Sequence, residues 1–303
     1  MQSRRDVLRG GAALAATGVL GGLAGCSAIT GGGGGNYANW IPEADDYGDR
    51  DHLGFTTIRP SDIASNEDAF SEDYFDLLEN TESNFDATGI DFEDVTASTY
   101  FSGSTVLSGG LDGEAVREEL EDNEYEEDDE VGGYRLYVPD GVSDPRRCWG
   151  VGGSVFATSA VGDMDAVETA ELLVETTGGD GSRQVDDSEA FGAVVDAVGA
   201  PTIGTGGTFD EEEGDEPESG VFEHSVGRGA AVNVNGETSD VAAYVVFDEA
   251  DDVDTGDLED WVDENDGSDG TFDDVDDVSY NANGRVGTVS GTIDTDDLGG
   301  QFL

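Results

Sequence analysis

Short runs in which apolar and polar residues alternate fill most of the chain after residue 36, and segments with helical spacing interrupt them. The alternating runs predict strands at residues 53–58, 95–101, 105–108, 133–138, 230–234, 241–247, 275–280 and 286–293, and a further strand begins at residues 201–203. The pair Asn283-Gly284 predicts a hairpin between the last two alternating runs. Helical spacing predicts helices at residues 68–78, 112–122, 164–174, 188–198 and 256–264. Because the strands alternate instead of running continuously apolar, we expect an α+β fold of mostly antiparallel sheets with helices packed on one face.

A break in composition divides the predicted elements into two lobes. Residues 204–220 are rich in glycine and acids and almost lack apolar residues, so we interpret them as an acidic linker or exposed loop. The first lobe then spans residues 37–203 and the second spans residues 221–303. Residues 105–138 and 242–293 share the order strand, helix, strand pair. This order indicates either a diverged duplication or the common recurrence of one supersecondary unit.

The first 26 residues form a separate segment with the pattern of an export signal. Arg4 and Arg5 precede a charge-free apolar run, and small residues lead from that run to Cys26. The run is shorter than the roughly 20 apolar residues that cross a bilayer, which disfavours a permanent membrane span. We therefore expect residues 1–25 to be a twin-arginine signal peptide and Cys26 to be lipidated after cleavage. Residues 26–36 then form a glycine-rich tether at the membrane.

The charge balance limits the partners of the chain. Asp and Glu number 71 against 12 Lys and Arg, for a net charge of -59, and every basic residue is arginine. Nucleic-acid binding needs a basic footprint, which this composition excludes. Attachment to a membrane must therefore rest on the lipid at Cys26. An acidic disordered protein is the alternative, but 36% hydrophobic and 8% aromatic residues in periodic runs favour a folded domain.

Two resemblances follow from these features. The acidic composition, combined with Arg4, Arg5 and Cys26, resembles the twin-arginine-exported surface lipoproteins of extremely halophilic archaea. That resemblance implies a protein lipid-anchored at the extracellular face of the cell membrane. Residues 149–203 also resemble a module of uncharacterised bacterial and archaeal surface proteins, in which a strand and a helix precede a second helix that begins near Ser-x-x-Phe, here Ser188 to Phe191. This module has no established activity, so it supports the fold class alone.

Motifs of covalent catalysis are absent from the sequence. Without lysine the chain has no Schiff-base residue and no phosphate-loop lysine, and it contains no Gly-x-Ser-x-Gly elbow. The two histidines, His52 and His224, are not spaced as a zinc-ligand pair. Cys148 follows two arginines, which either activate its thiol or simply precede a buried residue of a strand. A pair of catalytic carboxylates cannot be recognised among so many acids.

One acidic segment offers weak candidates for a metal site. Asn265, Asp269 and Asp276 fall roughly where a calcium loop would place its ligands. Gly267 occupies a position that should supply an oxygen, and no helix pair flanks the loop. A solvated acidic loop is the alternative. We predict no other cofactor.

The sequence thus favours a non-catalytic surface or envelope protein that contacts a partner protein. The alternative is a lipoprotein that captures a small solute or a cation in an aromatic-lined cleft. An extracellular hydrolase that uses carboxylates is a third and weaker hypothesis.

Overall fold

The computed structural model describes residues 37–48, 52–72, 74–75, 81–143, 145–212, 214–265, 272 and 274–298. All of them belong to the second of two compact units, Gly33–Leu303. They form twelve strands: β1 (Gly54–Ile58), β2 (Val95–Phe101), β3 (Ser104–Gly109), β4 (Tyr125–Val131), β5 (Tyr134–Pro139), β6 (Arg147–Val151), β7 (Val155–Ser159), β8 (Ile203–Thr208), β9 (Ser225–Asn235), β10 (Thr238–Phe247), β11 (Asp276–Asn283) and β12 (Val286–Asp294).

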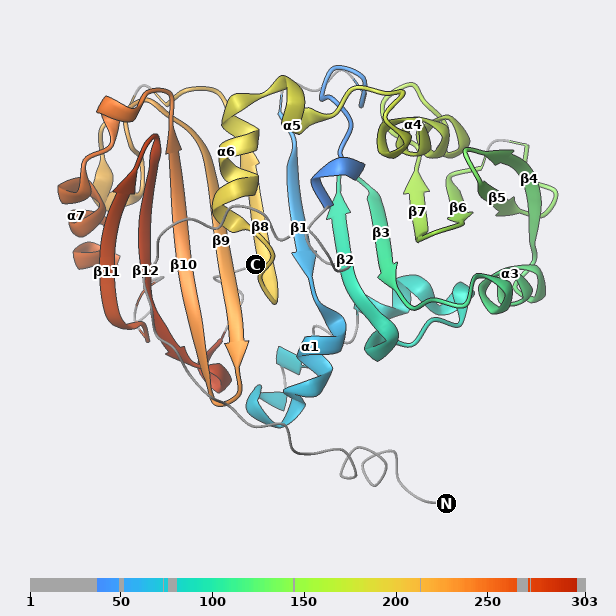
Figure 1. Cartoon of the computed structure of the whole chain (residues 1–303), viewed down its shortest axis with the longest axis horizontal. Helices are drawn as coiled ribbons and strands as arrows, with labels where there is room; N and C mark the ends of the chain where they lie inside the picture. The colour runs from blue at the N-terminus through green and yellow to red at the C-terminus, as the bar shows by residue number, and fades with distance from the viewer. Residues whose placement is uncertain are drawn as a thin grey trace. The chain divides into compact units, whose positions relative to one another are not determined.

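The helices of the described residues are α1 (Pro60–Ser65), α3 (Gly113–Asp122), α4 (Ala166–Gly178), α5 (Gln184–Asp187), α6 (Glu189–Val198) and α7 (Thr255–Asn265) (Figure 1). Short 3-10 turns, η3 (Tyr37–Trp40), η4 (Glu67–Ala69), η5 (Thr81–Thr88), η6 (Phe92–Asp94), η7 (Pro217–Ser219), η8 (Ala250–Asp252) and η9 (Thr295–Asp297), connect these elements. Local signals explain the helix ends. Asp165 caps α4 in a capping box with Glu168, and Gly179 ends α4 in the left-handed conformation.

The twelve strands form one sheet in the order β11-β12-β10-β9-β8-β1-β2-β3-β7-β6-β5-β4 (Figure 1). Each neighbouring pair is antiparallel. The hairpin predicted at Asn283-Gly284 joins β11 to β12, and Gly284 has a φ of 60°. The predicted α+β class with antiparallel strands is therefore confirmed.

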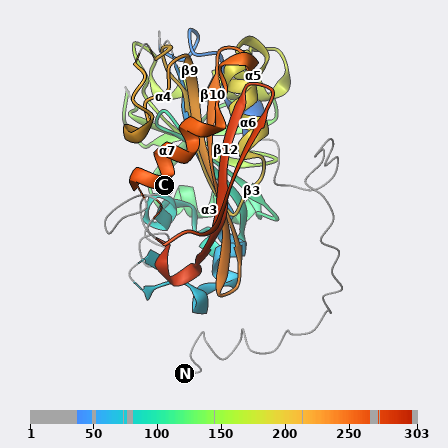
Figure 2. The ribbon, with the colours of Figure 1, turned by 90° about the vertical axis from the view of Figure 1, so that its left-hand side faces the viewer.

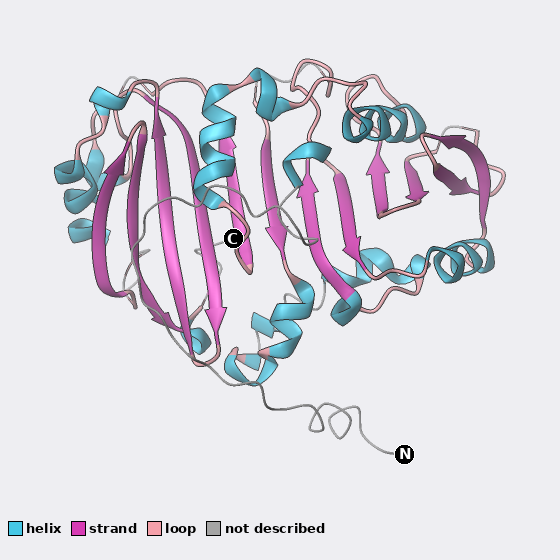
Figure 3. Cartoon of the chain, viewed as in Figure 1, coloured by secondary structure: helices cyan, strands magenta, loops and turns pink. Residues whose placement is uncertain are grey.

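Helices cover both faces of this sheet, whereas the sequence predicted one covered face (Figures 2 and 3). Neighbouring residues on a strand point to opposite faces. On β3, Val106 packs in the cluster that contains α4 and α6, and Leu107 packs in the cluster that contains α3. On β10, Val246 joins the α4–α6 cluster, and Val245 packs against α7. Two apolar faces need two helical layers because each face would otherwise expose its core side chains.

The predicted acidic linker begins inside the sheet. Residues 203–208 form β8, which pairs with β1 on one side and with β9 on the other, so the two predicted lobes share one sheet. The glycines of β8 admit a helix at close range, since a Cβ at Gly206 would lie 2.5 Å from Cγ1 of Val194 in α6. A glycine-rich stretch that looks like a linker is thus a strand lying directly beneath α6.

Candidate ligand-binding cleft

One wall of a cleft is formed where the first described residues meet the segment before α5. Arg183 Nη1 donates to Asn39 Oδ1 at 2.7 Å, and the backbone N–H of Glu43 donates to the carbonyl of Ser182 at 3.2 Å. The backbone N–H of Gln184 donates to the carbonyl of Ile41 at 3.0 Å. These bonds hold residues 41–45, distant in sequence, against α5.

A second wall is the start of α6. Ser188 caps this helix, and its Oγ accepts a hydrogen bond from the backbone N–H of Phe191 at 3.2 Å. The first backbone N–H groups of a helix have no acceptor within the helix. Here the N–H of Ala190 donates to no acceptor among the described residues. Ser188 and Ala190 both line the cleft.

The third wall combines the end of β8 with β9 and the residues before β1. The backbone N–H of Phe209 donates to the carbonyl of Val226 at 3.1 Å, and that of Thr208 donates to the carbonyl of Leu53 at 3.3 Å. The guanidinium of Arg228 lies over the ring of Phe209, 5.3 Å from its centroid. His52 lines this side of the cleft.

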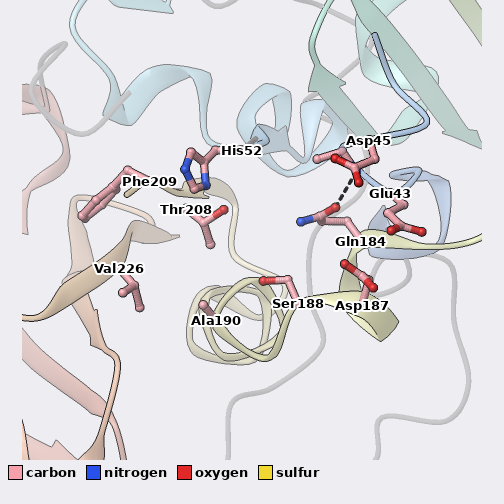
Figure 4. A pocket seen from close by; sticks show the side chains of 11 residues that line it. Glu43, Asp45, His52, Gln184, Asp187, Ser188, Ala190, Thr208, Phe209 and Val226 are labelled. Atoms are coloured by element: carbon pink, nitrogen blue, oxygen red, sulfur yellow. Dashed lines mark hydrogen bonds between the residues drawn. The ribbon is translucent and has the colours of Figure 1, made fainter. Parts of the chain in front are cut away.

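The three walls enclose about 300 Å³, at the lower end of the volumes of small-molecule sites. The lining residues are Glu43, Ala44, Asp45, His52, Gln184, Asp187, Ser188, Ala190, Thr208, Phe209 and Val226. Figure 4 shows them in two groups, with the carboxylates of the first wall and of α5 at one end and the apolar side chains of Phe209 and Val226 at the other. The cleft is therefore acidic at one end, and at the other end the apolar side chains of Phe209 and Val226 lie near His52 and Thr208 (Figure 4).

Gln184 is the most buried polar side chain of the cleft, with only 4% of its surface exposed. Its Oε1 accepts a hydrogen bond from the backbone N–H of Ala44 at 2.7 Å, which fixes the orientation of the amide. Its Nε2 donates to no acceptor among the described residues, and it points into the cleft (Figure 4). Because the amide nitrogen faces the open cleft, a molecule in the cleft can accept its hydrogen bond.

An acidic loop, residues 209–212, borders the cleft, and both histidines of the chain bind it. His52 Nε2 lies 3.1 Å from Asp210 Oδ1, and His224 Nδ1 lies 2.5 Å from Glu211 Oε1. The hydrogen bond to Glu211 raises the pKa of His224 above its ordinary value. The carboxylate of Glu212 accepts hydrogen bonds from Arg228, Ser225 and the backbone of Phe222. The loop is thus fastened along its length.

The residues that the sequence singled out lie elsewhere. Arg4, Arg5 and Cys26 are outside the described residues, and so is Asp269. Asn265 ends α7, where its Nδ2 donates to the carbonyls of Glu218 and Trp261. Asp276 lies at the exposed start of β11. The calcium site remains a prediction, with its ligand set only partly described.

Cys148 lies in β6 with none of its surface exposed. Burial raises the pKa of its thiol to about 12, so the thiolate that would react is not formed at neutral pH. The structure therefore favours the interpretation of Cys148 as a buried core residue.

Sequence reasoning did not find the cleft. The sequence offered no signal that Glu43 or Gln184 lies near Ser188 or His52. Glu43 and Gln184 lie more than 100 positions apart, and only the pairing of residues 41–45 with the segment before α5 brings them together.

Comparisons with known proteins add a fold likeness. No family model matches the chain, and no curated protein sequence matches it. The fold resembles crystal form I of the protein TP0453, with a TM-score of 0.45, 11% identity, and coverage of 85% of this chain and 92% of that chain. Crystal form III aligns with a TM-score of 0.46 and 10% identity over 85% of this chain and 93% of the other. Function must therefore be inferred from the residues of the chain itself.

Among the described residues, no helix has the length and apolar composition needed to cross a membrane.

Proposed function

We propose that this protein is exported, is anchored by lipid on Cys26 at the outer face of the cell membrane of a halophile, and captures a small organic solute in the cleft without covalent chemistry. The leader, the acidic composition and the Gly-rich tether support the first two parts. The cleft supports the third, and it favours solute capture over a purely structural role in the envelope.

The observation that carries solute capture is the amide of Gln184. The Gln184 side chain is buried and held by Ala44, yet its N–H groups face the open cleft with no acceptor among the described residues (Figure 4). A fixed polar group at the wall of a cleft is suited to orient a bound molecule. The surrounding carboxylates, hydroxyls and apolar side chains are the mixture found in sites that orient a small molecule.

The same cleft lacks the contacts of a hydrolase. His52 and Asp210 form a pair, and Ser188 lines the same cleft as His52, which gives the three residue types of a catalytic triad. No hydrogen bond joins Ser188 to His52, and Ser188 Oγ caps α6. A triad needs the base within hydrogen-bond reach of the nucleophile. Binding without reaction therefore fits these contacts better than acyl transfer does.

A melting scan tests solute capture. The purified full chain would be heated in molar salt with amino acids, amines, sugars, peptides, phosphate compounds and divalent metals. A ligand at 100 times its dissociation constant adds about 2.7 kcal/mol to the folded state, which raises the melting temperature by several degrees. We expect one class of organic solute to produce this shift. A panel that leaves a cooperative melting transition unmoved would contradict solute capture.

The anchor has its own test. We expect the mature protein to begin at a lipid-modified Cys26, as measured by mass spectrometry of its N-terminal peptide. The change Cys26→Ser should release the protein from the membrane fraction, and replacement of both Arg4 and Arg5 by Lys should stop export. An unmodified Cys26 in the exported protein would contradict lipid anchoring.

A further inference from the structure

Three hydrogen-bond donors line the cleft, so they favour a ligand that carries a hydrogen-bond acceptor. Gln184 Nε2 points into the cleft with no described partner. The hydroxyl of Ser188 accepts a bond from Phe191 and keeps its own proton to donate. The N–H of Ala190 adds a donor at the start of α6, where the helix dipole favours negative charge. A carboxylate is the acceptor that such donors bind most strongly.

The carboxylates of the cleft favour a ligand that also carries a cationic group. Glu43, Asp45 and Asp187 line the acidic end. None of the three forms an ion pair with a described arginine or histidine, in contrast to Asp210 and Glu211 of the bordering loop. An anion alone would be repelled from this end, whereas an ammonium group would bind there.

The opposite end of the cleft provides an apolar surface beside the polar side chains of His52 and Thr208 (Figure 4). Phe209, Val226 and Ala190 line it, and all three are partly buried. This contact also distinguishes a specific ligand from ordinary counter-ions. The protein carries a net charge of -59, so cations surround it everywhere, and in molar salt charge attraction extends only about 3 Å. Apolar contact is not screened by salt and can select an organic ligand.

From these three features we infer that the captured solute is a small zwitterion, with an ammonium group and a carboxylate on a short apolar body, as in a free apolar amino acid. The inference rests on the proposed capture function and specifies its ligand. The ammonium lies among Glu43, Asp45 and Asp187, the carboxylate meets Gln184 and Ser188, and the apolar body lies toward Phe209. A bare metal ion does not fit, because the amide of Gln184 presents hydrogens to the cleft and not oxygen.

The test measures binding of matched probes by calorimetry, with the full chain in molar NaCl. L-Valine, L-leucine and L-phenylalanine would each be compared with the methyl ester, which lacks the carboxylate, and with the N-acetyl derivative, which lacks the ammonium. We expect at least one free amino acid to bind roughly 10- to 100-fold more tightly than both of its derivatives, the factor for losing a hydrogen bond to a charged group.

Two variants assign the two charged ends of the ligand. Gln184→Glu keeps the oxygen that accepts from Ala44 and replaces the donor by a second carboxylate oxygen. We expect it to weaken binding of the free amino acid at least tenfold while leaving the methyl ester unchanged or tighter. Asp187→Asn should weaken the binding of the free amino acid and of its methyl ester by the same factor. Asp180→Asn removes the same charge from an exposed position outside the cleft and should change neither.

The outcomes separate the inference from the function on which it rests. If no probe binds and no other solute shifts the melting temperature, solute capture itself is wrong. If amines or methyl esters bind as tightly as the free amino acids, the protein does capture a solute, but the inference that the solute is a zwitterion is wrong. If Gln184→Glu weakens amino acid and ester alike, with an unchanged melting temperature, the carboxylate does not meet Gln184 and the inference also fails.

Discussion

The two ends of the sheet repeat one arrangement. At one end β3 is followed by α3 and then by β4 and β5, and at the other end β10 is followed by α7 and then by β11 and β12. Both helices pack on the same face. In both cases the chain passes to an edge strand and then returns toward the centre. The order strand, helix and strand pair thus occurs at both ends, although the sequence predicts only the second strand of the pair that contains β4.

The ends differ in what separates the repeated strands. β12 pairs directly with β10, whereas the hairpin β6–β7 lies between β5 and β3. The edges differ too, since β4 contains the acids Glu126 to Glu130 in an almost fully exposed strand, and β11 is less charged. Charged edge strands prevent pairing with other chains. The comparison shows that one arrangement can accept an inserted hairpin and still end the sheet at a protected edge.

The substitutions with the largest expected effect on stability test whether both ends of the sheet unfold together. Leu120 of α3 and Leu258 of α7 are fully buried in separate clusters, so Leu120→Ala and Leu258→Ala should each destabilise the fold by about 2–5 kcal/mol. Because one sheet joins the clusters, each change should lower the melting temperature at both ends. Single-tryptophan variants that keep Trp149 or Trp261 report the two ends by fluorescence. Separate transitions would show that the ends are independent.

Removing the N-cap side chain of α3 or of α7 should cause a smaller loss of stability, of similar size at the two ends. The Asp112 side chain accepts hydrogen bonds from the backbone of Glu114 and Ala115 at the start of α3, and Asp254 accepts one from Gly256 at the start of α7. Asp112→Ala and Asp254→Ala should each destabilise the protein by about 1 kcal/mol. Urea titration in molar salt measures both. If only one of the two variants lost stability, the side-chain caps of α3 and α7 would not contribute equally to the fold.

A pH dependence should affect one end only. Glu211 raises the pKa of His224, so the bond between them stabilises the fold fully below the ordinary value of 6.5, and this contribution is lost as pH rises through the raised pKa. The acidic loop should therefore exchange its amide hydrogens faster at alkaline pH, after correction for intrinsic exchange. His224→Gln should remove this dependence. Equal changes around β4 would contradict a local origin.

The smallest effect concerns the charged edge. Asp128 of β4 is exposed among four other acids, and Asp128→Asn should stabilise the protein by about 0.5 kcal/mol or less at low salt. The gain should vanish in molar salt because screening removes the repulsion. Asn281→Asp on β11 is the reciprocal change and should destabilise slightly at low salt. Melting temperatures at two salt concentrations measure both. A gain that persists in molar salt would exclude charge repulsion as its cause.

Much of the fold was predictable where local signals act. Asp112 and Ser188 cap helices that the sequence placed at nearly the same positions, and Asn283-Gly284 makes the predicted hairpin. β4 was missed because an exposed edge strand needs no alternation of apolar residues. The sequence predicts the start of a strand at residues 201–203 but a linker from residue 204, because the glycines of β8, which let α6 approach, are also typical of loops.

The sequence by itself determined the acidic character, the export and lipidation signals as predictions, the α+β class, and the caps and turns, because each depends on composition or on residues a few positions apart. Only the tertiary structure decided that one sheet spans both predicted lobes and that Glu43, Gln184 and Phe209 line one cleft. Those outcomes depend on hydrogen bonds between segments far apart in the chain, which no short stretch of sequence encodes.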